Sequence, residues 1–327
     1  MPELDRHGVV AAAVLAALGL APLVAWLAGE TYLISVFTRI AIYALAAMSL
    51  DFILGYGGMV SFGHAAFLGI GAYVAGVLSL HAYEATPLLL GLPGSNQALV
   101  VWPLAFVVAA ACAAVIGLVS LRTRGVYFIM ITLAFAQMIY FFFVSLEPYG
   151  GDDGLSLWWG RNRLGPLDLG DRLTFFYVAF AILVAALLVF RRLVHSRFGR
   201  VLRGCRQNER RMRALGYEPL PYRLAALCIA GGVCGLAGAL LANQTEFVSP
   251  ALMHWSRSGQ LMVMVILGGM GSLGGAVLGA GTLLLMEEVL VSYTEHWQAI
   301  LGPFLILVVL FARRGLVGLL SGPGRNG

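Results

Sequence analysis

Ser61 and His64 lie three residues apart inside a long apolar stretch of the chain. On a helix this spacing places both side chains on one face, where an imidazole can take the proton of a hydroxyl nucleophile. The pattern is compatible with a hydrolase embedded in a membrane. No residue that would orient the imidazole is apparent, however, and a histidine in such surroundings is also typical of a packed, hydrogen-bonded structural residue. The sequence leaves both interpretations open.

Other polar side chains also interrupt apolar stretches. An ionisable group inside a membrane is costly and usually faces a cavity or another polar group. We expect Asp51 to cap a broken helix near the inner surface. Arg39 lies twelve residues earlier, about 18 Å along a helix, so we expect it to extend toward the outer interface instead, where Glu287 and Glu288 also belong. The candidates for lining a translocation pathway are Asp51, Ser61, His64, Gln137 and Gln260.

Two features of composition limit the chemistry further. All 21 basic residues are arginine, so the lysine that a P-loop needs to reach nucleotide phosphates is missing, and Schiff-base chemistry is excluded as well. Work driven by ATP must therefore come from a partner. The cysteines form no C-x-x-C pair and are expected to be small buried residues rather than metal ligands or a disulfide; they are Cys112, Cys205, Cys228 and Cys234. We expect no metal or cofactor on this chain.

A basic segment follows in the second half of the chain, reading RFGRVLRGCRQNERRMRALGYEPLPY over residues 197–222. We expect a short amphipathic helix at about 206–215, with Met212 and Leu215 on one side and Gly216 as its stop. Such a helix can lie on anionic lipid, dock in the groove of a partner, or serve only to fix membrane orientation. The residues alone do not choose among these roles.

The elements that must position these residues are membrane helices. The chain has 327 residues, of which 60% are hydrophobic and 11% charged, whereas soluble domains average about 45–50% and about 25%. This composition excludes soluble enzymes, nucleic-acid-binding domains and disordered chains. We predict an all-α integral membrane protein with a single transmembrane domain over residues 1–327.

A bilayer core requires about 20 apolar residues per helix. Ten spans meet this length, if the stretch 259–293 is split at its glycines and if the stretch near 55–75 is not a broken or re-entrant helix. The predicted spans are 8–28, 32–54, 59–83, 97–119, 125–147, 173–194, 222–243, two within 259–293, and 297–312. The acids and the long apolar run at the start favour a retained anchor over a cleaved signal.

The arginines set the orientation. Nine lie within residues 191–222 against two acids, and the positive-inside rule places this segment in the cytoplasm. The loop 147–172 contains five acids and three arginines, which indicates an external position. Ten spans then bring both termini to the cytoplasmic side.

Glycines gather in three clusters, at 55–71, 231–238 and 268–281. Small residues allow membrane helices to approach closely. Alternatively, the glycines break helices whose freed backbone groups line a pathway. The first and third clusters favour the broken-helix interpretation, because polar residues lie among their glycines.

Several segments together resemble one family of transport proteins. They read LGYGGMVSFGHAAF at 54–67, GGDDGL at 150–155, FVSP at 247–250, VILGGMGSLGG at 265–275 and FARRGL at 311–316. In this order they are similar to the branched-chain amino acid permeases of ABC importers, in their LivM-type branch. The segment 208–216 also resembles the ATPase-coupling loop of such permeases, although Arg210, Arg211 and Met212 stand where small residues are usual.

The resemblance implies a permease subunit, not an enzyme, in a bacterial inner membrane. Such a subunit pairs with a second permease, binds two cytoplasmic ATPase subunits that hold ATP and Mg²⁺, and receives its solute from a periplasmic binding protein. The loop 195–222 would couple the ATPases to transport, and the external loop 147–172 would meet the binding protein. The implied coupling residues are Glu209, Arg213, Ala214, Leu215 and Gly216.

Two questions stay open at this point. Urea and short-amide permeases resemble the same segments, so the solute is either a branched-chain amino acid or a related small polar molecule. A self-sufficient secondary transporter or channel is the alternative mechanism, although the few acids within the spans offer little for a proton relay.

Overall fold

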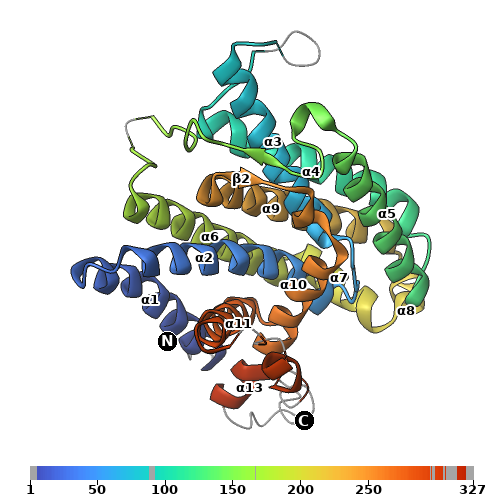
Figure 1. The fold of residues 1–327 in the computed structure, drawn as a ribbon. Helices are drawn as coiled ribbons and strands as arrows, with labels where there is room; N and C mark the ends of the chain where they lie inside the picture. The colour runs from blue at the N-terminus through green and yellow to red at the C-terminus, as the bar shows by residue number, and fades with distance from the viewer. Residues whose placement is uncertain are drawn as a thin grey trace.

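The computed structural model describes residues 6–87, 93–165, 167–294, 296, 299–304, 306 and 315–321. Helices dominate the described part (Figure 1). The first half contains α1 (Arg6–Leu27), α2 (Thr31–Asp51), the π-helix η1 (Phe52–Tyr56), α3 (His64–Glu84), α4 (Ala98–Ser120), α5 (Val126–Val144) and the 3₁₀ turn η2 (Glu147–Tyr149). The second half contains β1 (Leu155–Ser156), α6 (Arg172–His195), α7 (Arg197–Gln207), α8 (Glu209–Ala214), α9 (Pro219–Thr245), β2 (Phe247–Val248), η3 (Pro250–Met253), α10 (Trp255–Gly268), α11 (Leu273–Tyr293) and α13 (Gly315–Ser321).

The composition argument for a helical membrane protein is confirmed. Within the described residues, seven helices are long and apolar enough to cross a bilayer: α3, α4, α5, α6, α9, α11 and the continuous run of α2 with η1. The predicted division of 259–293 into two helices is also correct, because 269–272 is not helical. The predicted last span, 297–312, falls largely outside the described residues.

Two helices differ from the predicted spans. α3 begins at His64, not at 59, because residues 57–63 form an irregular buried segment after η1. α10 has 14 residues, which is about 21 Å at 1.5 Å per residue, so it is too short to cross a hydrocarbon core of about 30 Å. It is preceded by the irregular lead-in 246–254, which contains β2 and the 3₁₀ helix η3.

α9 lies in the middle of the bundle, packed against α2, α3 and α4 (Figure 1). Its glycines make this packing possible. Gly71 of α3 lies directly against the carbonyl of Gly235 on α9, and Gly238 lies against the carbonyl of Leu68. The second glycine cluster therefore serves close helix packing, as predicted for small residues in a bilayer.

This packing gives a first testable prediction. In Gly71→Ala, the added methyl group would overlap the Gly235 carbonyl, so we expect α3 and α9 to separate slightly at a cost of about 1–3 kcal/mol. The measurement is the melting temperature of the detergent-purified protein, which should fall by several degrees. Gly281→Ala is the matched control, because its methyl group would meet Ile40 at an ordinary contact distance of 3.7 Å. Equal melting temperatures for the two variants would contradict the prediction.

Candidate translocation and coupling sites

His64 lies at the first turn of α3, where α2, α3 and α9 meet, and it is fully buried. Its Nε2 lies 2.8 Å from the hydroxyl oxygen of Ser49. Because Ser49 donates its own proton to the carbonyl of Ala46 at 2.7 Å, the imidazole Nε2–H must be the donor in this contact. The other ring nitrogen has no hydrogen-bond partner among the described residues. His64 is therefore a packed histidine with one nitrogen still unused.

The hydrolytic interpretation of Ser61 and His64 is not supported by this geometry. Ser61 precedes the helix, so the two side chains do not share a helical face. The hydroxyl of Ser61 accepts from the backbone N–H of Gly63 at 3.2 Å, whereas His64 takes Ser49 as its partner. Ser61, like His64, is almost completely buried.

α3 and α10 begin beside one another. The backbone N–H of Ala65 in α3 donates to the hydroxyl of Ser258 in α10 at 2.9 Å. Met253 of η3 also packs against Gly69 of α3. The first turns of both helices thus lie next to each other, each reached through an irregular segment. This arrangement matches the broken-helix interpretation of the first glycine cluster.

A second junction joins the first and third glycine clusters at the C-terminal end of α2. Asp51 is buried, and its Oδ1 accepts from the backbone N–H of Gly271 at 2.7 Å. Asp51 therefore caps the loop between α10 and α11, whereas the sequence suggested that it caps the broken helix next to it in the chain. Gly55 touches the backbone of Gly271 and has no room for a methyl group. Arg206 of α7 donates a hydrogen bond to the Gly55 carbonyl.

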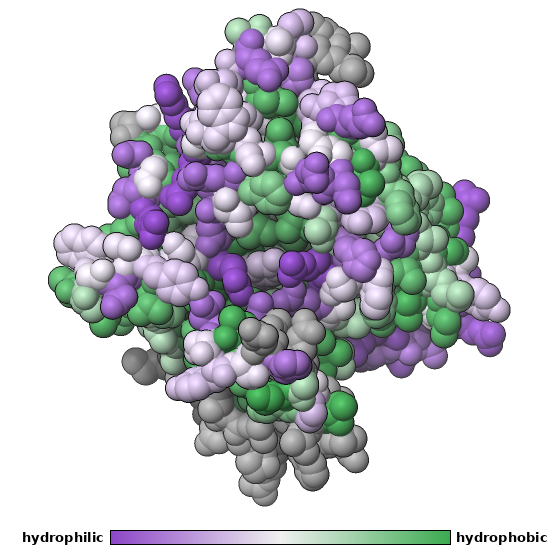
Figure 2. Space-filling view, viewed as in Figure 1, coloured by the Kyte–Doolittle hydropathy of each residue, from purple (hydrophilic) through white to green (hydrophobic). Residues whose placement is uncertain are grey.

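Charged and amide side chains meet on the face formed by α2, α10 and α11. Arg39 lies 3.4 Å from one carboxylate oxygen of Glu287, and Gln260 donates to the other at 3.3 Å. The amide oxygen of Gln260 accepts from Arg257 at 3.0 Å. We call Arg39, Glu287, Gln260 and Arg257 the polar chain. Figure 2 shows hydrophilic groups around a hollow in the middle of this face.

The polar chain adds to two expectations. Arg39 forms an ion pair with Glu287, one of the acids expected at the same interface. Gln260, a candidate from the sequence, does lie at this polar face, but Arg257 was not among the candidates. Arg257 could have been found in the sequence as an arginine near the start of an apolar helix. Gln137 on α5 is half-buried, and its side-chain nitrogen has no partner among the described residues.

The basic segment forms two helices rather than the one predicted at 206–215. α7 ends at Gln207, and Asn208 then caps α8 by accepting from the backbone N–H of Arg211 at 3.0 Å. Met212 folds back over Gly204, whereas the side chain of Leu215 is 63% exposed. Gly216 has φ of +85°, a conformation that glycine adopts without strain. Met212 and Leu215 therefore do not share one apolar side.

Glu209 anchors α8 to the rest of the protein. Its carboxylate accepts from Arg124 at 2.7 Å and from Arg213 at 2.9 Å, and it pairs with Arg223 at 3.1 Å. Arg124 precedes α5 and Arg223 belongs to α9, so one side chain connects three parts of the chain. The Glu209 side chain is only 11% exposed. It holds α8 in place, while Ala214, Leu215 and Gly216 remain exposed at its end.

The described part of the loop 147–172 is held by contacts with other elements. β1 pairs antiparallel with β2. Asn162 and Asn243 form two hydrogen bonds of 2.7 Å with each other, and Asn162 also donates to Ser79 at 2.9 Å. At its end, Asp171 caps α6 by accepting from Thr174, which lowers the pKa of that carboxyl. Trp158 remains mostly exposed.

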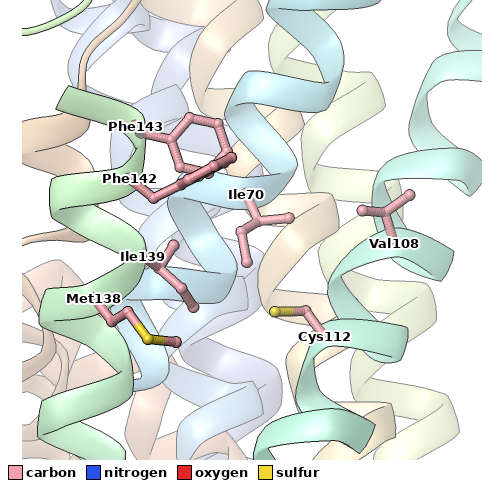
Figure 3. A pocket seen from close by; sticks show the side chains of 7 residues that line it. All are labelled: Ile70, Val108, Cys112, Met138, Ile139, Phe142 and Phe143. Carbon is pink, nitrogen blue, oxygen red and sulfur yellow. The ribbon is translucent and has the colours of Figure 1, made fainter. Parts of the chain in front are cut away.

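An apolar crevice of about 430 Å³ opens between α3, α4 and α5 (Figure 3). It offers no charged group or amide for a small polar solute, so its chemistry suits an acyl chain better. Its lining residues are Ile70, Val108, Cys112, Met138, Ile139, Phe142 and Phe143.

Comparison with known proteins connects this geometry to transport. Residues 32–312 match the family described as "Branched-chain amino acid transport system / permease component". The chain is 30% identical to the high-affinity branched-chain amino acid transport system permease protein LivM of Salmonella typhimurium over 307 residues, covering 87% of this chain and 69% of the relative.

Two further relatives extend the comparison. A probable branched-chain amino acid transport permease protein LivM of Methanocaldococcus jannaschii is 26% identical over 80% of this chain and 83% of its own length. The permease protein LivH of the Salmonella high-affinity system is 25% identical, over 84% of this chain and 91% of its own. No solved structure matches the chain.

Proposed function

This chain belongs to the family of branched-chain amino acid transport permeases, and from that membership we propose that it is a transmembrane subunit of an ABC importer. It would carry branched-chain amino acids inward across the inner membrane of a bacterium. A second permease, two ATPase subunits and a periplasmic binding protein would complete the transporter.

The observation that carries this proposal is the way α8 is presented. A permease that does not hydrolyse ATP must offer its ATPase a rigid contact. Glu209 fixes α8 through three arginines, and the exposed Leu215 and Gly216 form its outer end. The chain has no lysine for a P-loop of its own, so ATP and Mg²⁺ would bind to the partner subunits.

The contacts between elements support ten membrane crossings with both termini in the cytoplasm. Arg206 of the basic segment reaches Gly55, and Gly55 touches Gly271, so the loop between α10 and α11 lies at the cytoplasmic end. Ala11 of α1 packs against Gly274, and Gly315 of α13 packs against Gly269. The N-terminal and C-terminal helices of the described chain thus lie on this same side of the bundle. The count of ten treats α3 and α10 as crossings that their irregular lead-ins complete.

These same contacts suggest how α8 would act on the pathway. ATP binding would close the ATPase pair and move α8 together with α7. Arg206 of α7 would carry this movement to Gly55, beside the bond between Asp51 and Gly271. Asp51, Ser61 and His64 are buried in this structure, and rocking of the helices would bring them to the pathway. Gln137 would be a further lining residue.

The ordered external loop 147–172 would be the surface that meets the binding protein. Its pairing with β2 and with Asn243 connects it to the C-terminal end of α9 and to the segment that leads into α10. Docking of the binding protein on this loop could thereby move the helices that form the pathway.

The test is reconstitution. We expect this chain to co-purify with the products of its neighbouring genes and, in liposomes, to take up radiolabelled leucine only when ATP is enclosed with the ATPase subunits. Uptake of radiolabelled urea is measured in parallel under the same conditions. Uptake that persists without any ATPase subunit would contradict the proposal and favour a self-sufficient transporter or channel. ATP-driven uptake of urea but not of leucine would contradict the solute assignment alone.

A further inference from the structure

The polar chain lies well inside the membrane-spanning helices. Arg39 is eight residues from the start of α2 and Glu287 six residues from the end of α11, or about 12 Å and 9 Å at 1.5 Å per residue. Their side chains are still 35% and 20% exposed. Because ionised groups do not face lipid tails without a high cost, these partly exposed side chains must face water or protein.

We propose that the polar chain recognises both charges of the amino acid that this importer would carry. The inference rests on the importer function proposed above. It assigns the carboxylate of the solute to Arg257 and its ammonium group to Glu287.

Arg257 suits a carboxylate. Among the described residues it has no acidic partner, and its polar side-chain contact is the neutral amide of Gln260. A guanidinium group has five N–H donors in a planar fork that matches a carboxylate, so several donors remain. Arg257 also lies in the first turn of the 14-residue α10, where the helix dipole favours a negative charge.

Glu287 suits an ammonium group. Its contacts with Arg39 and Gln260 are 3.4 and 3.3 Å long, whereas strong charge-assisted hydrogen bonds measure about 2.7–2.9 Å. An incoming ammonium group can therefore form a shorter bond than either present partner does.

Gln260 marks the two places that the solute would take. Its amide oxygen contacts Arg257 and its amide nitrogen contacts Glu287. An amino acid would replace these two contacts by ion pairs, which are stronger. Urea would only reproduce the contacts that the tethered amide already makes, so it would not displace Gln260.

The test uses the complete transporter in liposomes, with radiolabelled leucine. We expect Arg257→Gln and Glu287→Gln each to lower ATP-driven uptake about tenfold, the effect of losing a hydrogen bond to a charged group. Stimulation of ATP hydrolysis by the binding protein should persist, because coupling is untouched. Arg257→Lys should recover part of the uptake. Glu288→Gln is the matched control, since this neighbouring acid instead accepts from Tyr32, and it should transport normally.

The possible results distinguish a failure of this inference from a failure of the proposed importer function. If the wild-type transporter takes up leucine and both glutamine variants keep more than half of that rate, the inference is wrong and the importer function stands. If the wild type takes up no leucine, the proposed function fails first. If Arg257→Gln does not assemble, as judged by the subunits that co-purify, Glu287→Gln alone decides.

Discussion

Changing Leu215 to Asp together with Gly216 to Val is expected to abolish ATP-driven uptake, by at least about 100-fold, while the chain still inserts into the membrane. Leu215 is the large apolar side chain exposed at the end of α8, and a buried carboxylate in its place would oppose docking. Gly216 has φ of +85°, where valine is strained. The double variant therefore lacks both the apolar side chain and the positive-φ residue that docking of the ATPase would require.

The measurement is leucine uptake in proteoliposomes beside ATP hydrolysis by the assembled complex. A matched variant, Leu215→Met with Gly216→Asn, keeps an apolar side chain and a residue that tolerates positive φ, so it should retain most of the uptake. Normal transport by the Asp/Val variant would refute the assignment of residues 208–216 as the coupling segment.

The second large effect is expected for Glu209→Gln. The carboxylate is nearly buried and faces Arg124, Arg213 and Arg223, so its removal leaves three guanidinium groups close together without their shared acid. Loss of one partner from a partly buried ion pair costs about 2–3 kcal/mol, below the value for full burial. We expect α8 to detach part of the time and uptake to fall about 30-fold or more.

Glu218→Gln provides the control for this prediction. Glu218 lies in the same basic segment, is exposed, and has no ion pair among the described residues. Protease cleavage within 208–218 should become faster in Glu209→Gln than in Glu218→Gln, because a detached helix exposes its backbone. Identical cleavage and uptake in the two variants would show that Glu209 does not anchor α8.

Much of the fold could be predicted because the bilayer imposes a simple length rule. Apolar stretches of about 20 residues gave α4, α5, α6 and α9 within a few residues of their ends. The glycine clusters also indicated where helices break, at 57–63 and 269–272. The start of α3 was misplaced because Met59, Val60 and Phe62 make 57–63 apolar enough to continue the predicted span.

The contacts that define the candidate site could not be predicted, since they join residues far apart in the sequence. Asp51 caps a backbone N–H 220 positions later, and Arg39 meets Glu287 on a different helix. Periodicity describes one helix at a time, so it suggested a separate role for each of these side chains. The division between α7 and α8 was missed for a local reason: Asn208 was not considered as a helix cap.

The interrupted helices have a consequence for the speed of transport. Bending a continuous helix within a bilayer breaks backbone hydrogen bonds where no water replaces them. Here the lead-ins to α3 and α10 are already irregular, and a hydrogen bond from the backbone N–H of Ala65 to the hydroxyl of Ser258 joins the two helices. Each transport cycle then needs to remake only a few such bonds, which suits the microsecond-to-millisecond range of gating motions. The costly disruption of the helices occurs once, when the protein folds.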